Sequence, residues 1–374
     1  MPASAFYQPP ASGHTRVAPP TALRAISGPA AWLGADLARR DDWIRHFSDA
    51  EIAAIEATVR RLEPSAIDVP ELGPDSFAPP ELAGLVADIQ QTLRDGRGFI
   101  LLRGLPLERW SRRAAALAYF GLSRMLGELA SQNALGHILG HVKDLGRDYA
   151  QATERGYQTS ARLSYHSDAS DIVGLLCLQP ARAGGKSSLV ASATVYNRML
   201  AQRPDLVAEL CKPVYRDRRG EVPAGADPWY AVPVFNPMPD GRLVTAYVRS
   251  AMRKAQRFAE VPRSTPALEA ACDLLDAIAG DPEVHLQMDF RVGDIQYLNN
   301  HTILHSRTAF EDFPEPERRR HLWRIWVACR DWPALPECYT RNWQGALAGG
   351  RPAGIRIQGV PLIAPLDVAV PLND

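Results

Sequence analysis

The chain lacks an excess of charge of either sign and any long apolar run. Its 42 basic and 42 acidic side chains give a formal net charge of zero over 374 residues. A general nucleic-acid binder needs a basic excess to neutralise phosphates, so we expect no nucleic-acid partner. The apolar run over 172–178 is far short of the ~20 residues that cross a bilayer. We therefore expect no membrane span.

The sequence also lacks a pattern of paired cysteines, and we expect no leader sequence. The five cysteines are scattered and form no CxxC pair. Residues 1–30 hold six prolines but no basic start followed by an apolar core, the pattern of a signal peptide. Both absences predict a reduced, cytoplasmic protein. Lysine is scarce as well, with only four among the 42 basic residues. An isolated arginine in this chain is therefore weaker evidence of function than usual.

Hydrophobic periodicity predicts helices first and strands afterwards. Helical spacing indicates helices from about 49, from about 80, over 111–126, over 194–211 and over 266–279. Short β-like runs occur at 99–103, 163–168, 172–178, 187–192, 243–249, 284–290, 295–299 and 322–329. Many strands with turn residues and few strand–helix–strand alternations favour an antiparallel barrel or sandwich with flanking helices.

The segment Ser164-Tyr-His-Ser-Asp168 is the most informative part of the sequence. In a strand, residues two apart point to the same face, so His166 and Asp168 can offer two ligands to one metal ion. His305, which follows a later predicted strand, supplies a third. Two histidines and one carboxylate form the facial triad that leaves positions open on Fe(II) for an oxidant and a co-substrate.

Other interpretations of these residues stay open at this point. His166 and Asp168 can form an ordinary hydrogen bond between strands, and His305 can be a core histidine at a strand end. His301 is a rival metal ligand four residues before His305.

The segment 320–329 alternates with period two, as a half-buried strand does. One face carries Trp323, Ile325, Val327 and Cys329, and the other carries Arg320, Leu322, Arg324 and Trp326. Arginines on the inner face of a barrel are costly unless each meets an anion. The alternative is an outward face with solvated arginines.

Taken together, these motifs resemble the TauD/TfdA (taurine dioxygenase-like) family of Fe(II)- and 2-oxoglutarate-dependent oxygenases, in the clavaminate synthase-like superfamily. The resemblance covers roughly 98–332. It is carried, in order, by His166-Ser-Asp168, Gly184-Gly-Lys-Ser187, Gly293-Asp-Ile…Asn300, His305-Ser-Arg307-Thr-Ala-Phe310 and Arg320-His-Leu-Trp-Arg324.

The resemblance implies a fold that is mainly β with flanking helices (α+β), around a double-stranded β-helix, or jelly roll. We expect a proline-rich tail over 1–30 and a single catalytic domain over 31–374. That domain comprises a helical part (31–97), a jelly-roll core (98–345) with an insertion at about 194–282, and a C-terminal extension (346–374).

The resemblance also implies the roles of the site residues. His166, Asp168 and His305 would be the iron ligands and the catalytic centre. Arg320 and Ser187 would bind the distal carboxylate of 2-oxoglutarate, and Arg324 an anionic substrate. Fe(II), 2-oxoglutarate and O2 are the implied cofactor and co-substrates.

The implied reaction is hydroxylation of an unactivated C–H bond in a small, anionic or amino-acid-like molecule, with release of succinate and CO2. The same machinery can desaturate or cyclise a substrate in natural-product biosynthesis. A non-enzymatic jelly roll that binds a ligand and a redox-inert metal hydrolase are further alternatives. A homo-oligomer is compatible with the sequence, which does not define the oligomeric state.

Overall fold

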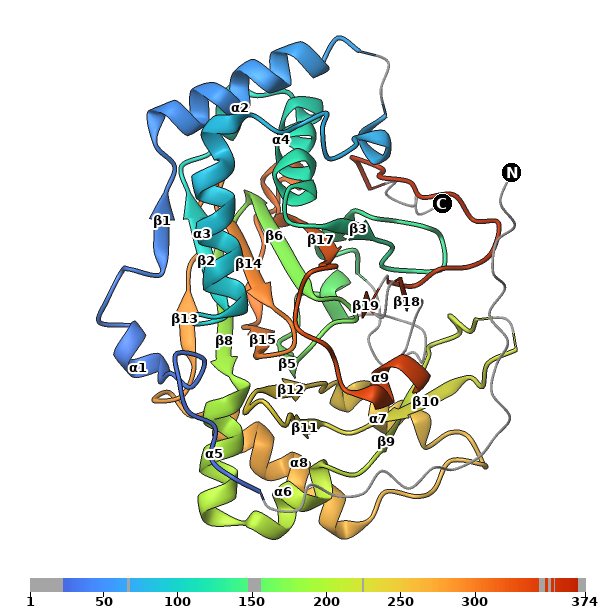
Figure 1. The fold of residues 1–374 in the computed structure, drawn as a ribbon. Helices are drawn as coiled ribbons and strands as arrows, with labels where there is room; N and C mark the ends of the chain where they lie inside the picture. The colour runs from blue at the N-terminus through green and yellow to red at the C-terminus, as the bar shows by residue number, and fades with distance from the viewer. Residues whose placement is uncertain are drawn as a thin grey trace.

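The computed structural model describes residues 23–65, 68–146, 156–223, 225–342, 347–348, 351–352 and 354–368. Its centre is a pair of β-sheets (Figure 1). The larger sheet has the strand order β1-β2-β14-β6-β17-β3, and β4 also pairs with β17. The smaller sheet has the order β13-β8-β15-β5. Most of the predicted tail, 1–22, lies outside the described residues.

The strands of the larger sheet are β1 (Ile44–His46), β2 (Phe99–Arg103), β3 (Glu128–Ala130), β4 (Gly140–Val142), β6 (Ile172–Gln179), β14 (Ile295–Asn299) and β17 (His321–Ala328). Those of the smaller sheet are β5 (Leu163–His166), β8 (Ser187–Ala191), β13 (Leu286–Met288) and β15 (Ile303–Arg307). Four short pairs complete the strands: β7 (Ala183–Gly184) with β16 (Phe310–Glu311), β9 (Val214–Asp217) with β10 (Trp229–Val232), β11 (Phe235–Pro237) with β12 (Leu243–Thr245), and β18 (Leu347–Ala348) with β19 (Arg351–Pro352).

The two sheets pack against each other through a shared apolar layer. Phe99 and Leu101 of β2 belong to the same buried cluster as Leu189 of β8 and Ile303 of β15. The strand β2 is buried on both faces because Ile100 and Leu102 point the other way, toward the helices. Two facing, mainly antiparallel sheets with helices outside confirm the predicted α+β architecture with a jelly-roll core.

Helices cover the outer face of the larger sheet, at the top of Figure 1. They are α2 (Asp49–Leu62), α3 (Ala83–Arg94) and α4 (Arg112–Arg124), and the short α1 (Gly34–Leu37) contacts β13. Helix α2 begins at a capping box, in which Ser48 Oγ accepts from Glu51 N and Glu51 Oε2 accepts from Ser48 N. Trp323 and Ile325 of β17 pack into this helical layer, as the predicted alternation of 320–329 requires.

A second group of helices covers the outer face of the smaller sheet. It consists of α5 (Ser192–Gln202), α6 (Pro204–Leu210) and α8 (Pro266–Ala279), with α7 (Arg249–Ala255) beside β9. The predicted strand at 243–249 is wrong beyond Thr245, because α7 begins at Arg249. The guanidinium of Arg249 forms ion pairs with three carboxylates of α8, so contacts distant in sequence override the local β pattern.

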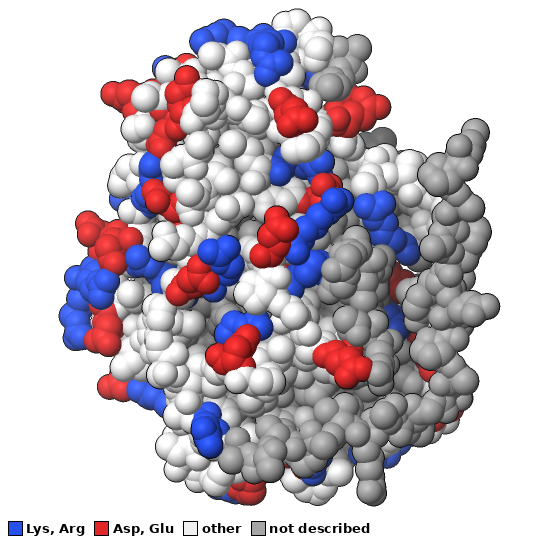
Figure 2. Space-filling model, in the orientation of Figure 1, with Lys and Arg blue, Asp and Glu red and all other residues white. Residues whose placement is uncertain are grey.

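The C-terminal segment returns to the larger sheet after α9 (Glu337–Asn342). Gly354 bridges to Ser131 beside β3, and Ile363 bridges to His137. On the face drawn in Figure 2, basic and acidic side chains are interspersed rather than separated into two patches. Within the described ranges, no helix is both long and apolar enough to cross a bilayer.

Candidate metal centre and its surroundings

Three side chains that are far apart in sequence converge at one point between the sheets. His305, in the middle of β15, pairs across the ladder with His166 at the end of β5. Their ring centroids lie 4.2 Å apart, and His305 Nε2 lies 3.8 Å from Asp168 Oδ2. One ligand atom from each residue lies within 4.8 Å of the others. Among the described residues this is the one such group of histidine, cysteine and acidic side chains.

Asp168 does not lie on the strand as the sequence predicted. Strand β5 ends at His166, and Asp168 belongs to the loop that leads to β6. The side chain of Asn300 holds this loop: its Oδ1 accepts from Asp168 N at 2.7 Å, and its Nδ2 donates to Asp168 O at 2.5 Å and to Ser170 O at 2.9 Å. A long-range amide clamp therefore replaces strand geometry in fixing the carboxylate.

The electrostatics of the three groups suit a divalent metal ion. Burial lowers the pKa of His305 to about 3 and also lowers that of His166, which the nearby cations Arg324 and Arg219 depress further. Both imidazoles are therefore neutral at pH 7. His166 Nδ1 lies 2.9 Å from Ser164 O, so it carries the proton and leaves the Nε2 lone pair for a metal.

The carboxylate of Asp168 is kept charged. Burial acts to raise its pKa, but the groups around it, of which the Arg324 guanidinium has the largest effect, lower the pKa well below its usual value. Arg324 Nη1 and Trp326 Nε1 both donate to Asp168 Oδ2, at 3.2 and 3.1 Å. Two neutral imidazoles and one oriented carboxylate form a donor set that fits Fe(II).

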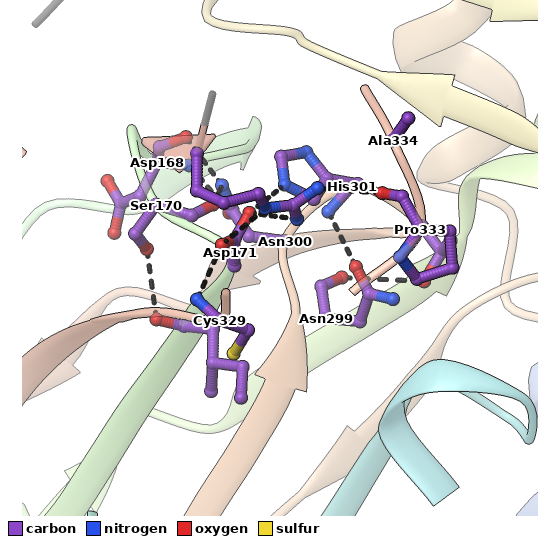
Figure 3. A network of polar contacts seen from close by, with 12 residues as sticks. Asp168, Ser170, Asp171, Asn299, Asn300, His301, Cys329, Pro333 and Ala334 are labelled. Carbon is purple, nitrogen blue, oxygen red and sulfur yellow. Dashed lines mark hydrogen bonds and ion pairs between the residues drawn. The ribbon is translucent and has the colours of Figure 1, made fainter. Parts of the chain in front are cut away.

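A second buried carboxylate, Asp171, ties the metal loop to three other segments (Figure 3). Its oxygens accept from His301 Nε2 at 2.7 Å, from Cys329 N at 2.7 Å, and from Arg351 through Nε at 3.0 Å and Nη2 at 2.5 Å. The rival ligand His301 is thus committed to Asp171. Asp171 is fully buried, so this paired network is part of the architecture that supports Asp168.

The inner end of the cavity holds two buried guanidiniums without an ion pair among the described residues. Arg320 precedes β17, and its Nη1 has no hydrogen-bond partner; Nε and Nη1 of Arg307 have none either. The ring of Phe310 lies 4.7 Å from the Arg307 guanidinium and 5.2 Å from that of Arg320. Burial lowers the pKa of Arg307 to about 9, with Arg320 adding repulsion, and burial lowers that of Arg320 to about 10. Two adjacent buried cations require an anion.

The glycine pair of the Gly-Gly-Lys-Ser motif makes room for Arg320. Gly184 and Gly185 have φ of +71° and +67°, and a Cβ on Gly185 would approach Arg320 Nε to 3.0 Å. Ser187 lies two residues further on and is opposite Arg307 in the β8–β15 register. Its Oγ accepts from Gln296 Nε2 at 3.1 Å. The motif therefore brings a hydroxyl and two guanidiniums to one end of the cavity.

The side chain of Arg324 is held on several sides. Its Nε donates to Gln132 Oε1 at 2.7 Å, Nη1 contacts Asp168, and Tyr157 lies 4.4 Å from the guanidinium. Nη2 is buried without a hydrogen-bond partner in the described structure. Arg324 thus has one nitrogen available for a further anion.

A family model matches most of the chain. The model described as "Taurine catabolism dioxygenase TauD, TfdA family" matches residues 59–326. The chain belongs to the TauD/TfdA family. It is a non-haem Fe(II)- and 2-oxoglutarate-dependent dioxygenase, with Fe(II), 2-oxoglutarate and O2 as cofactor and co-substrates.

Individual relatives of this TauD/TfdA dioxygenase cover most of its length. FR-33289 synthase from Streptomyces rubellomurinus is 29% identical over 332 residues, 87% of this chain and 97% of that protein. The taurine hydroxylase-like protein SAT17 from Stachybotrys chartarum is 28% identical over 303 residues, 79% of this chain and 77% of that protein. A solved asparagine oxygenase, in complex with Fe(II), 2S,3S-3-hydroxyasparagine and succinate, has a TM-score of 0.59 at 18% identity, covering 76% of this chain and 93% of that one. That likeness shows the shared fold.

Sequence reasoning missed two residues of this dioxygenase. It gave Arg307 no role, although Arg307 lies two residues after His305, and residues two apart in a strand point to the same face. It also did not single out Arg219, which lines the cavity from the turn after β9. No sequence pattern marks that position.

Proposed function

We propose that this dioxygenase hydroxylates an unactivated C–H bond of a small anionic or amino-acid-like substrate, with release of succinate and CO2. The observation that carries the proposal is the convergence of His166, Asp168 and His305 beside the buried guanidiniums of Arg307 and Arg320, which have no ion pair among the described residues. The metal ligands, the inner anion site and the remaining space lie in one cavity.

His166, Asp168 and His305 would hold the iron. The fit is supported by the free Nε2 of His166, by a carboxylate oriented by Arg324 and Trp326, and by His305 Nδ1, which is buried without a partner in the described residues. When bound, iron would supply, together with 2-oxoglutarate and O2, the oxidant for C–H cleavage. The protein contributes ligand geometry, orientation and exclusion of water.

Arg320 and Ser187 would bind the distal carboxylate of 2-oxoglutarate, and Arg307 would share that role. A guanidinium can hold a carboxylate through two parallel hydrogen bonds. Both arginines are nearly buried, at 4% exposure each, so a bound carboxylate would neutralise charge in a place from which water is largely removed. This gives the unpaired cations a purpose that folding alone does not.

Arg324 would contact an anionic group of the substrate through Nη2. Its contact with Asp168 means that the same side chain also orients a metal ligand. Replacement of Arg324 should therefore affect both substrate affinity and the metal site, whereas replacement of Arg320 should affect 2-oxoglutarate alone.

The test is turnover of 2-oxoglutarate by Fe(II)-loaded protein with a panel of small amino acids and other anions. Succinate release coupled to a hydroxylated product is expected for at least one of them. The variant His166→Ala should lose metal binding and turnover. Products lacking two hydrogens without added oxygen would instead indicate desaturation or cyclisation.

A further inference from the structure

A glutamine lies in the apolar layer between the two sheets. Gln296 of β14 is 1% exposed. Along β14, Ile295 and Tyr297 belong to the apolar cluster under the helices, whereas Leu298 belongs to the layer between the sheets. The period of two places Gln296 on the same face as Leu298. A buried amide lowers stability unless its hydrogen bonds are made, so its partners indicate what it does there.

The side chain of Gln296 crosses from the larger sheet to the smaller one. Its Nε2 donates to Ser187 Oγ at 3.1 Å and to Met288 Sδ at 2.9 Å. Its Oε1 lies 3.3 Å from Ser187 Oγ, close enough to accept from the hydroxyl. Ser187 and Met288 are register partners on β8 and β13. A thioether sulfur is a weak acceptor, so Ser187 is the principal partner of this amide among the described residues.

Ser187 also reaches the cavity, which Gln296 does not. Ser187 lines the cavity together with Arg307 and Arg320, whereas Gln296 is not part of the described lining. Ser187 is opposite Arg307 in the β8–β15 register. In the proposed function, the Ser187 hydroxyl binds the distal carboxylate of 2-oxoglutarate. Gln296 therefore contacts this hydroxyl from the interior of the sheet pair.

The amide of Gln296 suits a hydroxyl that has to change its hydrogen-bond direction. A hydroxyl has one proton, and a buried hydroxyl needs a partner for that proton in every state of the site. Before an anion binds, the proton of Ser187 points to Gln296 Oε1. When a carboxylate is bound, the proton turns to the carboxylate, and Gln296 Nε2 donates to the hydroxyl oxygen. A hydroxyl that accepts a hydrogen bond in this way is polarised and is a stronger donor.

We propose that Gln296 is a positioning residue for 2-oxoglutarate. It directs the Ser187 proton toward the distal carboxylate and keeps the hydroxyl hydrogen-bonded before and after the co-substrate binds. The inference rests on the proposed function and deepens it, by adding a residue that acts on the co-substrate only through Ser187. Folding alone does not favour a glutamine here, because Leu101 beside it on β2 and Leu298 both belong to the apolar layer.

The test is anaerobic calorimetry of the Fe(II)-loaded protein with two keto acids. 2-Oxoglutarate carries the distal carboxylate, and 2-oxopentanoate has a methyl group in its place. Gln296→Met removes both hydrogen-bonding functions and should weaken 2-oxoglutarate binding about three- to fivefold, the effect of one hydrogen bond. Gln296→Glu should weaken it at least about tenfold, because a carboxylate accepts the Ser187 proton, offers no donor and repels the co-substrate. Both variants should bind 2-oxopentanoate as tightly as the wild type does.

If Gln296 acts through Ser187, the effects of replacing the two residues are not additive. In a Ser187→Ala background, Gln296→Met should not weaken 2-oxoglutarate binding further, since the hydroxyl that Gln296 positions is gone. Gln287→Met is the matched control, because Gln287 of β13 is exposed and lies outside the cavity lining. It should leave the affinity for both keto acids unchanged.

Equal 2-oxoglutarate affinity in the wild type and both Gln296 variants would overturn the inference. A loss that persists at full size in the Ser187→Ala background, or that extends equally to 2-oxopentanoate, would also overturn it, since Gln296 would then act on the packing of the sheets. A wild type that binds 2-oxoglutarate no more tightly than 2-oxopentanoate would instead overturn the distal-carboxylate site of the proposed function.

Discussion

Arg351 and Arg320 are equally buried arginines near the metal centre, each 4% exposed, but they differ in what neutralises them. Arg351 places Nε and Nη2 on Asp171 and Nη1 on Pro333 O. Arg320 has no ion pair among the described residues, and its Nη1 has no hydrogen-bond partner. A buried charge with an internal partner belongs to the architecture. A buried charge without one indicates a ligand that is absent from the folded chain alone.

Removing Asp171, the counter-ion of Arg351, should have the largest effect on stability. Asp171→Ala would leave Arg351 buried without its counter-ion and His301 without its acceptor. We expect a loss of about 3–5 kcal/mol in the free energy of unfolding, measured by urea denaturation. The double variant Asp171→Asn/Arg351→Gln should lose less than Asp171→Ala, because no buried charge is then left alone. An Asp171→Ala protein with wild-type stability would contradict the assignment of this network to the architecture.

Replacing Arg320, the buried arginine without an ion pair among the described residues, should have the opposite effect on stability. Arg320→Gln removes a buried charge that folding does not compensate, so the free energy of unfolding should stay within about 1 kcal/mol of the wild type or rise. Binding of 2-oxoglutarate should weaken about 100-fold, through loss of charged hydrogen bonds of about 1.5–3 kcal/mol. The measurement is titration of Fe(II)-loaded protein with 2-oxoglutarate, followed by the visible band of the chelate.

Arg216→Gln is the buried-arginine control for Arg320→Gln. Arg216 is also buried, but it donates to three main-chain carbonyls and does not line the cavity. Its replacement should lower stability and leave 2-oxoglutarate affinity unchanged. If Arg216→Gln and Arg320→Gln changed stability and affinity alike, the distinction between the two kinds of buried arginine would fail.

The local elements of the fold and the long-range contacts around the metal centre also differ in how well the sequence predicts them. Local patterns identify the capping box at Ser48, the strand 99–103 and the helix 266–279, because each depends on neighbours a few residues apart. The cavity residues Arg320 and Ser187 lie in motifs that are continuous in sequence. The Asp171–Arg351 pair spans 180 positions and Asn300–Asp168 spans 132. No local pattern identifies such pairs. The prediction that Asp168 is positioned by a strand is therefore wrong, because the side chain of Asn300 holds it in a loop.

Low pH should add a positive charge beside the buried guanidinium of Arg320, through protonation of His321. His321 follows Arg320 and contacts His141 Nδ1 at 2.8 Å. Burial lowers the pKa of His321 to about 3, and His141 and the cations Lys143, Arg112 and Arg320 add to the effect. The unfolded chain therefore binds a proton near pH 6.5 that the folded chain rejects until about pH 3. Stability should fall as pH drops through this window, by up to about 1.4 kcal/mol per pH unit for this group. His321→Gln should flatten the slope of unfolding free energy against pH, and an unchanged slope would exclude this contribution.

The smallest expected effect tests the inner anion site with a neighbouring pair of serines. Ser187 faces the cavity opposite Arg307, whereas Ser188 points to the other side of β8 and shares a hydrogen bond of 2.6 Å with Tyr165 Oη. Ser187→Ala should weaken 2-oxoglutarate binding about fivefold, the worth of one hydrogen bond of about 1 kcal/mol. Ser188→Ala removes an equally buried hydroxyl from the same strand and should leave that affinity unchanged while lowering stability slightly. The reverse result, with Ser188→Ala weakening 2-oxoglutarate binding more than Ser187→Ala, would place the distal carboxylate elsewhere. It would also leave Arg320 and Arg307, which have no ion pair among the described residues, without an explanation at this end of the cavity.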